Sequence, residues 1–183
     1  MVTSLRHMAE MTLSLTEFAV LGLLAEEPRH GFAVSRDLEP STAVGRILTV
    51  RRPLVYRALD RLVGAGLAAP ARTEPGDAGP NRVVLRVTPP GRRHLRRWLG
   101  QPVAHIRDLR IEFLLKLTLL ERSGRSPLPL IRMQLDALRP ALARLERPVS
   151  PPDPVELWRQ HNAGAAASYL EHLEELYSMR PDV

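Results

Sequence analysis

The sequence contains no cysteine among its 183 residues. Disulfide bonds and thiolate metal sites are therefore excluded, which fits a reducing compartment, and we expect a cytoplasmic protein. No apolar run approaches the roughly 18 residues that a membrane-spanning helix requires, so we expect no membrane association. Residues 1–17 also lack the basic-then-apolar plan of a signal peptide.

Motifs of catalysis and of metal binding are missing as well. The six histidines include no pair at helical spacing with a glutamate between them, which is the pattern of zinc enzymes. Gly76 and Gly79 lie in a turn rather than between a strand and a helix, so they form no phosphate-binding loop. Ser14 and Ser35 lack the context of a catalytic nucleophile. We therefore expect no enzyme, no cofactor and no metal.

Positive charge is concentrated in the first half of the chain. The net charge is +6. Residues 1–100 contain 15 arginines and 9 acidic residues, whereas residues 101–183 contain 11 basic and 11 acidic residues. This asymmetry indicates a first half that meets a polyanion and a second half with another task.

Residues 51–62 predict a short helix with two different faces. At about 100° per residue, one side collects apolar side chains that can pack, namely Leu54, Val55, Ala58, Leu59 and Leu62. The other side collects Pro53, Tyr56, Arg57, Asp60 and Gly64, with Arg61 at its margin. Pro53 suits the first helical position, and Gly64-Ala65-Gly66 ends the helix.

Two further helices are expected before this one. Ser14 and Glu17 have the spacing of a capping box and begin a buried helix over about 15–26, which Pro28 closes. His30-Gly31-Phe32 opens a second helix that runs through Leu38, with Phe32 and Leu38 expected in the core. Three short helices with a basic third one outline a helix-turn-helix.

A β-hairpin and another helix follow. Residues 68–73 and 82–87 read as strands joined by a Gly/Pro-rich turn. In the second strand, alternation places Val83, Leu85 and Val87 on one face and Arg82, Val84 and Arg86 on the other. Thr88 caps the next helix and Pro89 takes its first position. This order is that of a winged helix.

The first half resembles the PadR family of bacterial transcriptional regulators. The resemblance rests on residues 15–24 (LTEFAVLGLL), His30-Gly31-Phe32, residues 55–62 (VYRALDRL), Gly66-Leu67 and residues 87–91 (VTPPG). It departs from the family at Phe32, where tyrosine is usual, at Arg51 and Arg52, where small polar residues are usual, and at Leu85, which is often aromatic. These departures concern DNA contacts more than the fold.

The second half predicts a helical domain. Residues 106–117 resemble the start of the family's C-terminal domain. Residues 130–145 predict a second helix, disturbed at Pro140, and 148–154 a proline-rich linker. Residues 155–179 predict a long helix of about 36 Å. We therefore expect a mainly α protein, with an N-terminal arm (1–13), a winged helix-turn-helix DNA-binding domain (14–100) and a helical dimerisation domain (105–183).

The resemblance implies a role as repressor of transcription, and the positions of the basic side chains give the candidate DNA contacts. Arginine can bond a guanine edge bidentately in the major groove, while other cations meet phosphate. The candidates for double-stranded DNA are Arg51, Arg52, Tyr56, Arg57, Arg61, Arg72, Arg82 and Arg86. For each arginine the alternative is a solvated helix or strand face, and Tyr56 could equally be half-buried beside Leu59. The alternative function is a winged helix that binds an acidic protein partner.

The long C-terminal helix supplies the candidate homodimer interface. Its stripe consists of Trp158, Ala165, Tyr169, Leu173 and Leu176. A twofold pair would match a palindromic operator, and the alternative is a bundle packed back within one chain. Trp98 and Trp158 are candidates for stacking a small apolar or aromatic effector, of the kind that the resemblance implies. Plain core packing is the alternative for both.

Overall fold

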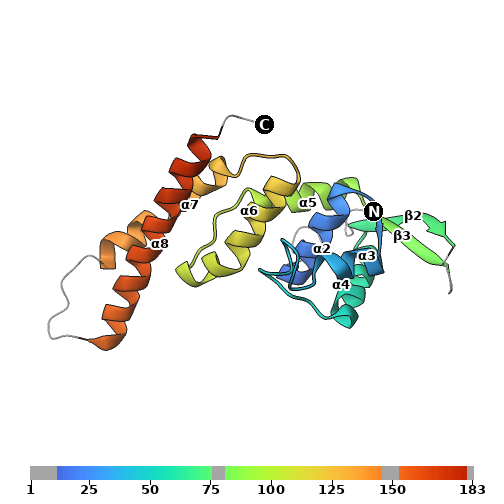
Figure 1. The fold of residues 1–183 in the computed structure, drawn as a ribbon, viewed down its shortest axis with the longest axis horizontal. Helices are drawn as coiled ribbons and strands as arrows, with labels where there is room; N and C mark the ends of the chain where they lie inside the picture. The colour runs from blue at the N-terminus through green and yellow to red at the C-terminus, as the bar shows by residue number, and fades with distance from the viewer. Residues whose placement is uncertain (1–11, 76–80, 146–152, 181–183) are drawn as a thin grey trace, which may run out of the picture. The chain divides into compact units, whose positions relative to one another are not determined.

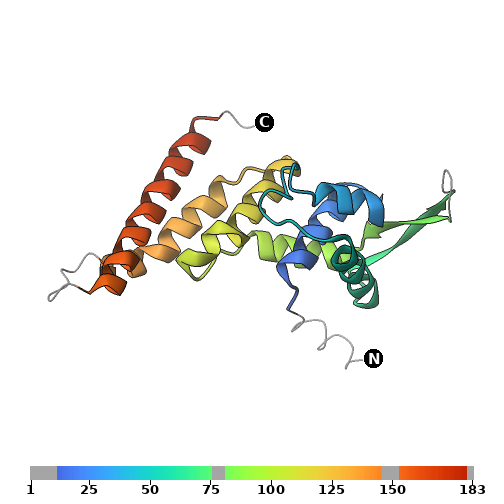
Figure 2. The same cartoon turned by 60° about the horizontal axis from the view of Figure 1, so that its bottom comes forward.

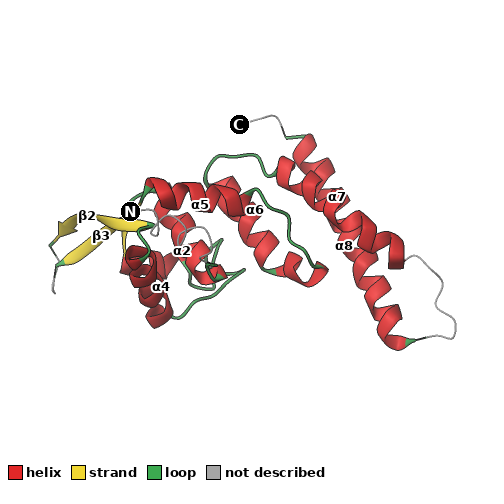
Figure 3. Cartoon of the chain, turned by 180° about the vertical axis from the view of Figure 1, so that it is seen from behind, coloured by secondary structure: helices red, strands yellow, loops and turns green. Residues whose placement is uncertain are grey.

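The computed structural model of the chain describes residues 12–75, 81–145 and 153–180 (Figure 1). The chain divides into two compact units, Met1–Trp98 and Leu99–Val183. Helices dominate the described residues, and the strands belong to the first unit (Figure 3). This confirms the mainly α class with a small sheet. The expected arm over residues 1–13 lies almost wholly outside the described residues.

The first unit is built around α2 (Leu15–Glu26). Both bonds of the expected capping box are present, since the Ser14 hydroxyl accepts from the Glu17 N–H and a Glu17 carboxylate oxygen accepts from the Ser14 N–H at 2.7 Å. Residues 17–24 are all buried. A helix that is apolar on every side forms the centre of a core rather than its wall.

A two-residue strand, β1 (Arg29–His30), precedes α3 (Gly31–Asp37). The His30 ring caps α3, because its Nδ1 accepts from the Ala33 N–H at 3.1 Å. Strand β1 was not expected, because two residues are too few to show the alternation that marks a strand. Leu38 is buried as expected, but Phe32 is 42% exposed, so its expected place in the core is wrong.

Helix α4 (Arg52–Gly64) packs against α2 and α3. Its buried residues are Val55, Ala58, Leu59 and Leu62. Leu54, expected on this side, is 45% exposed because it lies about 100° away from Val55 around the helix. Pro53 occupies the second rather than the first helical position. Gly66, with φ of 69°, ends the helix in the left-handed region that glycine tolerates.

Strands β2 (Ala68–Glu74) and β3 (Arg82–Val87) form the expected hairpin, and the sheet order is β1-β3-β2. The expected inner face of β3 is partly wrong, because Val84 is buried and Val83 is 49% exposed. Val84 is paired on both sides, with His30 and Arg72, whereas Val83 pairs only with Thr73. Burial in β3 therefore falls on Val84 and Val87 rather than on the expected set of Val83, Leu85 and Val87.

Helix α5 (Pro89–Leu99) begins as predicted, with the Thr88 hydroxyl accepting from the Gly91 N–H at 3.2 Å. The same hydroxyl also lies 2.7 Å from the Gly66 carbonyl oxygen. Toward the end of α5, the Trp98 ring stacks on Phe18 of α2 with centroids 4.1 Å apart. The helix is therefore held at its start to the α4–β2 turn and at its end to α2.

The second unit contains η1 (Ile106–Arg110), α6 (Glu112–Arg122), α7 (Leu128–Leu145) and α8 (Pro154–Ser178). The expected first helix thus starts as a 3₁₀ turn, and α7 continues through Pro140. α7 and α8 pack along each other (Figure 2). The expected proline-rich linker between them lies mostly outside the described residues.

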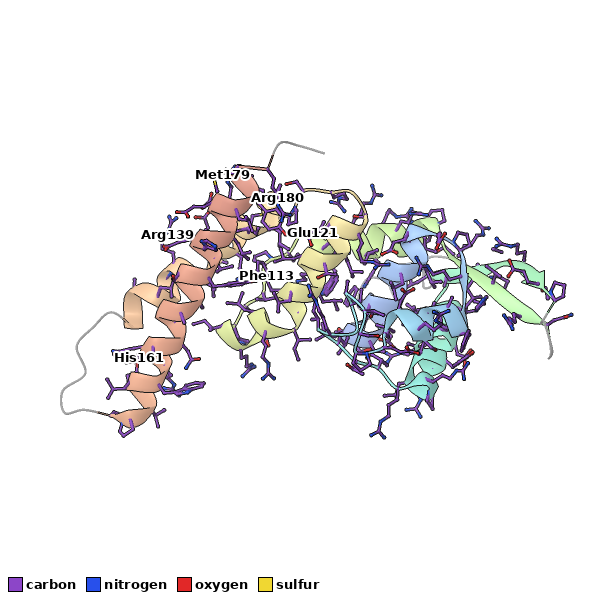
Figure 4. All side chains as sticks on the ribbon, viewed as in Figure 1. Phe113, Glu121, Arg139, His161, Met179 and Arg180 are labelled. Atoms are coloured by element: carbon purple, nitrogen blue, oxygen red, sulfur yellow. The ribbon has the colours of Figure 1, made fainter. Side chains whose placement is uncertain are left out.

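Two alanines and a leucine form the packed face of α8, whose buried positions are Ala163, Ala166 and Leu170. The C-terminal end of α8 is tied to α6, where Arg180 lies 3.3 Å from a Glu121 carboxylate oxygen (Figure 4). The Tyr177 hydroxyl donates to the same oxygen. Burial and then Glu121 raise the pKa of Tyr177 to about 12.

Two fully buried polar side chains form hydrogen bonds with the backbone of the segment before η1. Lys116 Nζ donates to the Gln101 carbonyl oxygen at 2.8 Å and pairs with Glu112 at 2.7 Å. Gln134 both accepts from the Val103 N–H and donates to the Val103 carbonyl oxygen. Burial lowers the pKa of Lys116, and the nearby Glu112 opposes this shift. The pairing compensates the cost of burying polar groups.

Candidate nucleic-acid interface

The exposed side of α4 gathers the basic groups that the sequence singled out. Arg51, Arg52 and Arg57 are all exposed at the start and middle of the helix. None of the ion pairs in the described part of the chain involves these three arginines. Their guanidinium groups are therefore available to an external anion.

Arg52 is held by an aromatic ring. Its guanidinium carbon lies 4.6 Å from the centroid of the Phe32 ring, in a cation–π contact. This contact explains why Phe32 is exposed although it is apolar. Sequence reasoning missed this role, because the pairing joins α3 to α4 across 20 positions of the chain.

Tyr56 packs its ring edge against the backbone of Gly31. A Cβ atom added to Gly31 would lie 2.7 Å from Tyr56 Cε1, so only glycine leaves room for the ring. Tyr56 nevertheless remains 43% exposed. The half-buried alternative and the exposed one are both partly right, since one edge is packed and the other faces solvent.

A groove of about 900 Å³ lies between α3, α4 and the hairpin. We call it the α4–wing groove; its apolar lining comes mainly from Phe32, Tyr56, Leu59, Val63, Val83 and Leu85. Arg52 and Arg82 also line it, so two candidates from α4, Arg52 and Tyr56, and one from the hairpin line the same groove. The groove carries aromatic and basic groups on one surface.

Three other candidates are placed differently. Arg61 pairs at 3.0 Å with Glu17, the buried carboxylate of the α2 capping box. Arg72 bonds Glu74 on its own strand at 2.8 and 2.7 Å, which offsets its charge. Arg86 does not line the α4–wing groove; it lines a separate hollow together with Arg92, Arg93 and Arg96 of α5.

The two tryptophans have opposite environments. Trp98 is 8% exposed and stacked in the core of the first unit. Trp158 is 68% exposed and lines a hollow of about 600 Å³ with Ile106, Arg107, Arg110, Arg159 and Asn162. Of the two effector candidates, only Trp158 has its side chain exposed to solvent.

The stripe expected at the dimer interface lies on the surface of α8. Trp158, Ala165, Tyr169 and Leu176 are exposed, and Leu173 is half-buried. These positions are distinct from Ala163, Ala166 and Leu170, which face the interior of the unit. The structure thus separates the two faces of α8.

Within residues 12–75, 81–145 and 153–180, no group of three or more metal-ligating side chains comes together. None of the helices there is both long and apolar enough to span a bilayer.

Comparison with known proteins gives a family match over the first unit. The model described as "Transcriptional regulator PadR-like family" matches residues 20–97, from α2 to α5. PadR of Bacillus subtilis, solved in complex with operator DNA, is 20% identical, with 86% of this chain and 97% of that chain covered and a TM-score of 0.45. The smu.1604c protein of Streptococcus mutans UA159 is 15% identical, with 88% and 95% covered and a TM-score of 0.42. No curated protein matches the sequence.

Proposed function

We propose, from the match of residues 20–97 to the PadR-like family of transcriptional regulators, that the chain is a bacterial, cytoplasmic repressor that binds operator DNA as a homodimer. Members of this family are regulators rather than enzymes, in agreement with the sequence analysis. In the proposal, residues 14–100 bind double-stranded DNA and residues 105–183 form the dimer.

The observation that carries the proposal is the exposed face of α4. An α-helix fits the major groove of duplex DNA, where arginine can bond guanine O6 and N7 bidentately. Arg57 lies in the middle of this face and takes part in none of the ion pairs of the described chain. We assign base contact to Arg57 with Tyr56 beside it, and phosphate contact to Arg51 and Arg52.

The hairpin supplies the second part of the DNA surface. Arg82 lines the same groove as Arg52 and Tyr56, which supports a phosphate contact from the wing. Arg61 and Arg72 remain secondary candidates, because each already has an acidic partner. Arg86 lines a separate hollow and has no place in this contact.

Exposed apolar groups on α8 support the dimer. Trp158, Tyr169 and Leu176 are large hydrophobic side chains with 68%, 40% and 37% of their surface exposed. Covering such a stripe with its copy removes apolar area from water. A closed twofold pair would present two α4 helices to the two halves of a palindromic operator.

We further propose that a small apolar or aromatic effector releases the repressor. The Trp158 hollow offers an open indole ring beside three arginines, which suits an aromatic compound. An effector that binds one arrangement of the two DNA-binding domains more tightly than the other shifts the population and the DNA affinity. Repression follows because an occupied operator excludes other proteins from the same DNA.

The test is fluorescence anisotropy with duplex DNA from upstream of the protein's own gene, beside a shuffled duplex, at low and physiological salt. Arg57→Ala should weaken binding to the native duplex by about 1–3 kcal/mol and leave binding to the shuffled duplex nearly unchanged. The matched control is Arg125→Ala, which removes an exposed arginine from the second unit.

Equal losses of Arg57→Ala on both duplexes would make Arg57 a phosphate contact only. Equal, salt-sensitive binding of the wild type to both duplexes would contradict operator recognition on this DNA. Absence of binding to either duplex at low salt would refute the proposal and favour an acidic protein partner.

A further inference from the structure

A second basic surface lies outside the α4–wing groove. Leu85 lines the α4–wing groove, whereas the next residue, Arg86, lines a separate hollow of about 380 Å³ that shares no lining residue with that groove. Helix α5 contributes Arg92, Arg93 and Arg96 to this hollow. We call it the arginine hollow and define it by these four arginines.

The four guanidinium groups lack acidic partners in the part of the chain that the structure describes. None of the ion pairs there involves Arg86, Arg92, Arg93 or Arg96. Arg92 is positioned by a bond from Nη1 to the Ala25 carbonyl oxygen at 3.0 Å. That bond satisfies one donor and leaves the positive charge of Arg92 without a counterion.

The positive charge of these arginines destabilises helix α5. Its first turn contains no acidic residue, although the positive end of a helix dipole favours negative charge. Arg92 and Arg96 are four residues apart, as are Arg93 and Arg97, and like charges at this spacing destabilise a helix. A bound polyanion would relieve both effects.

The hollow suits phosphate groups. Guanidinium forms bidentate, charge-assisted hydrogen bonds to phosphate oxygens. The first two residues of α5, Pro89 and Pro90, have no N–H, and the Gly91 N–H is taken by Thr88. Binding must therefore come from the arginine side chains, with Pro28, Val87 and Pro89 as apolar walls.

We propose that the arginine hollow binds a small anion with several phosphate groups, independently of the DNA-binding surface. The ligand would sit in a hollow that shares no lining residue with the α4–wing groove, so it does not compete with a duplex seated on α4. This inference goes beyond the proposed function and does not depend on it.

The test uses inorganic tripolyphosphate and the full chain in isothermal titration calorimetry at constant ionic strength, with sodium chloride making up the balance. The wild type should bind one tripolyphosphate per chain. The double variant Arg93→Gln/Arg96→Gln should lose roughly tenfold or more in affinity, because two of the four guanidinium groups are removed. The matched control is Arg97→Gln, which lies on the same helix outside the hollow and should keep wild-type affinity.

Two comparisons separate this site from the DNA surface. Arg57→Ala should bind tripolyphosphate as the wild type does, and Arg93→Gln/Arg96→Gln should bind duplex DNA as the wild type does. The proposal is overturned if tripolyphosphate gives no saturable heat, or if Arg97→Gln loses as much affinity as the double variant. It is also overturned if the double variant loses duplex affinity while the wild type ignores tripolyphosphate, since the arginines would then contact DNA phosphates.

Discussion

At the scale of single residues, the surroundings of His94 change its pKa. Its ring stacks on Phe18 with centroids 5.7 Å apart, at the inner side of α5. Burial, and then the positive charge of Arg97, lower the pKa of His94 below its ordinary value. The neutral ring is therefore the form that the folded protein favours.

This shift predicts an acid-sensitive core. The unfolded chain protonates this histidine near pH 6.5, whereas the folded chain does so only at lower pH. The contribution of His94 to stability is therefore present above about pH 6.5 and is lost as the pH falls toward its folded-state pKa. Melting temperatures measured from about pH 8 to pH 5 should fall more steeply for the wild type than for His94→Gln. Parallel pH profiles would show that His94 has an ordinary pKa.

At the scale of elements, the start of α5 lies in close contact with the backbone of the α4–β2 turn. Gly91 is buried, and a Cβ atom there would lie 2.1 Å from the Leu67 carbonyl oxygen. The Thr88 hydroxyl bonds the same turn. α5 and the α4–β2 turn are thus in contact along their main chains, and this contact sets where the arginines of α5 begin.

Gly91→Ala should destabilise the protein by about 3 kcal/mol, because the backbone must move to admit a methyl group. The matched control is Gly64→Ala at the end of α4, where a Cβ meets nothing within 4 Å. That change should stabilise by about 0.5 kcal/mol through the unfolded chain. Urea unfolding measures both. Equal effects of the two changes would show that α5 does not lie against Leu67.

At the scale of the whole molecule, the second unit leaves an apolar stripe uncovered. Trp158, Tyr169 and Leu176 share one side of α8, and Ala163 and Leu170 pack on another side. In the proposed dimer the stripe meets its copy. Charged residues placed there would lose their hydration in the interface, and this desolvation free energy exceeds the stabilisation from the contact.

The variant Tyr169→Arg/Leu176→Arg should therefore sediment as a monomer at concentrations where the wild type is a dimer. Its matched control is Glu171→Arg, which changes the net charge by the same amount on the opposite side of α8. The control should remain dimeric in analytical ultracentrifugation. A dimeric double variant would place the interface elsewhere, and a monomeric wild type would contradict the dimer itself.

Local signals in the sequence determined most of the elements. The capping box at Ser14 and Glu17, the Thr88 cap and the turn at Gly66 act within a few residues, so the bounds of α2, β3 and α5 followed from them. The charge asymmetry and the motif at residues 55–62 are also local signals, and they predicted the exposed face of α4 as the DNA-binding surface. Composition and local spacing are properties of the chain before it folds.

Tertiary structure decided which side chains meet. The Phe32 ring contacts the Arg52 guanidinium instead of packing in the core. Arg61 forms an ion pair with Glu17, and Arg86 lines a hollow with three arginines of α5. Each outcome depends on segments distant in the sequence, and periodicity within one element carries no information about the partner that it packs against. The sequence alone thus determined that the first half is basic. Only the packing of its elements decided that its arginines are divided between the α4–wing groove and the arginine hollow.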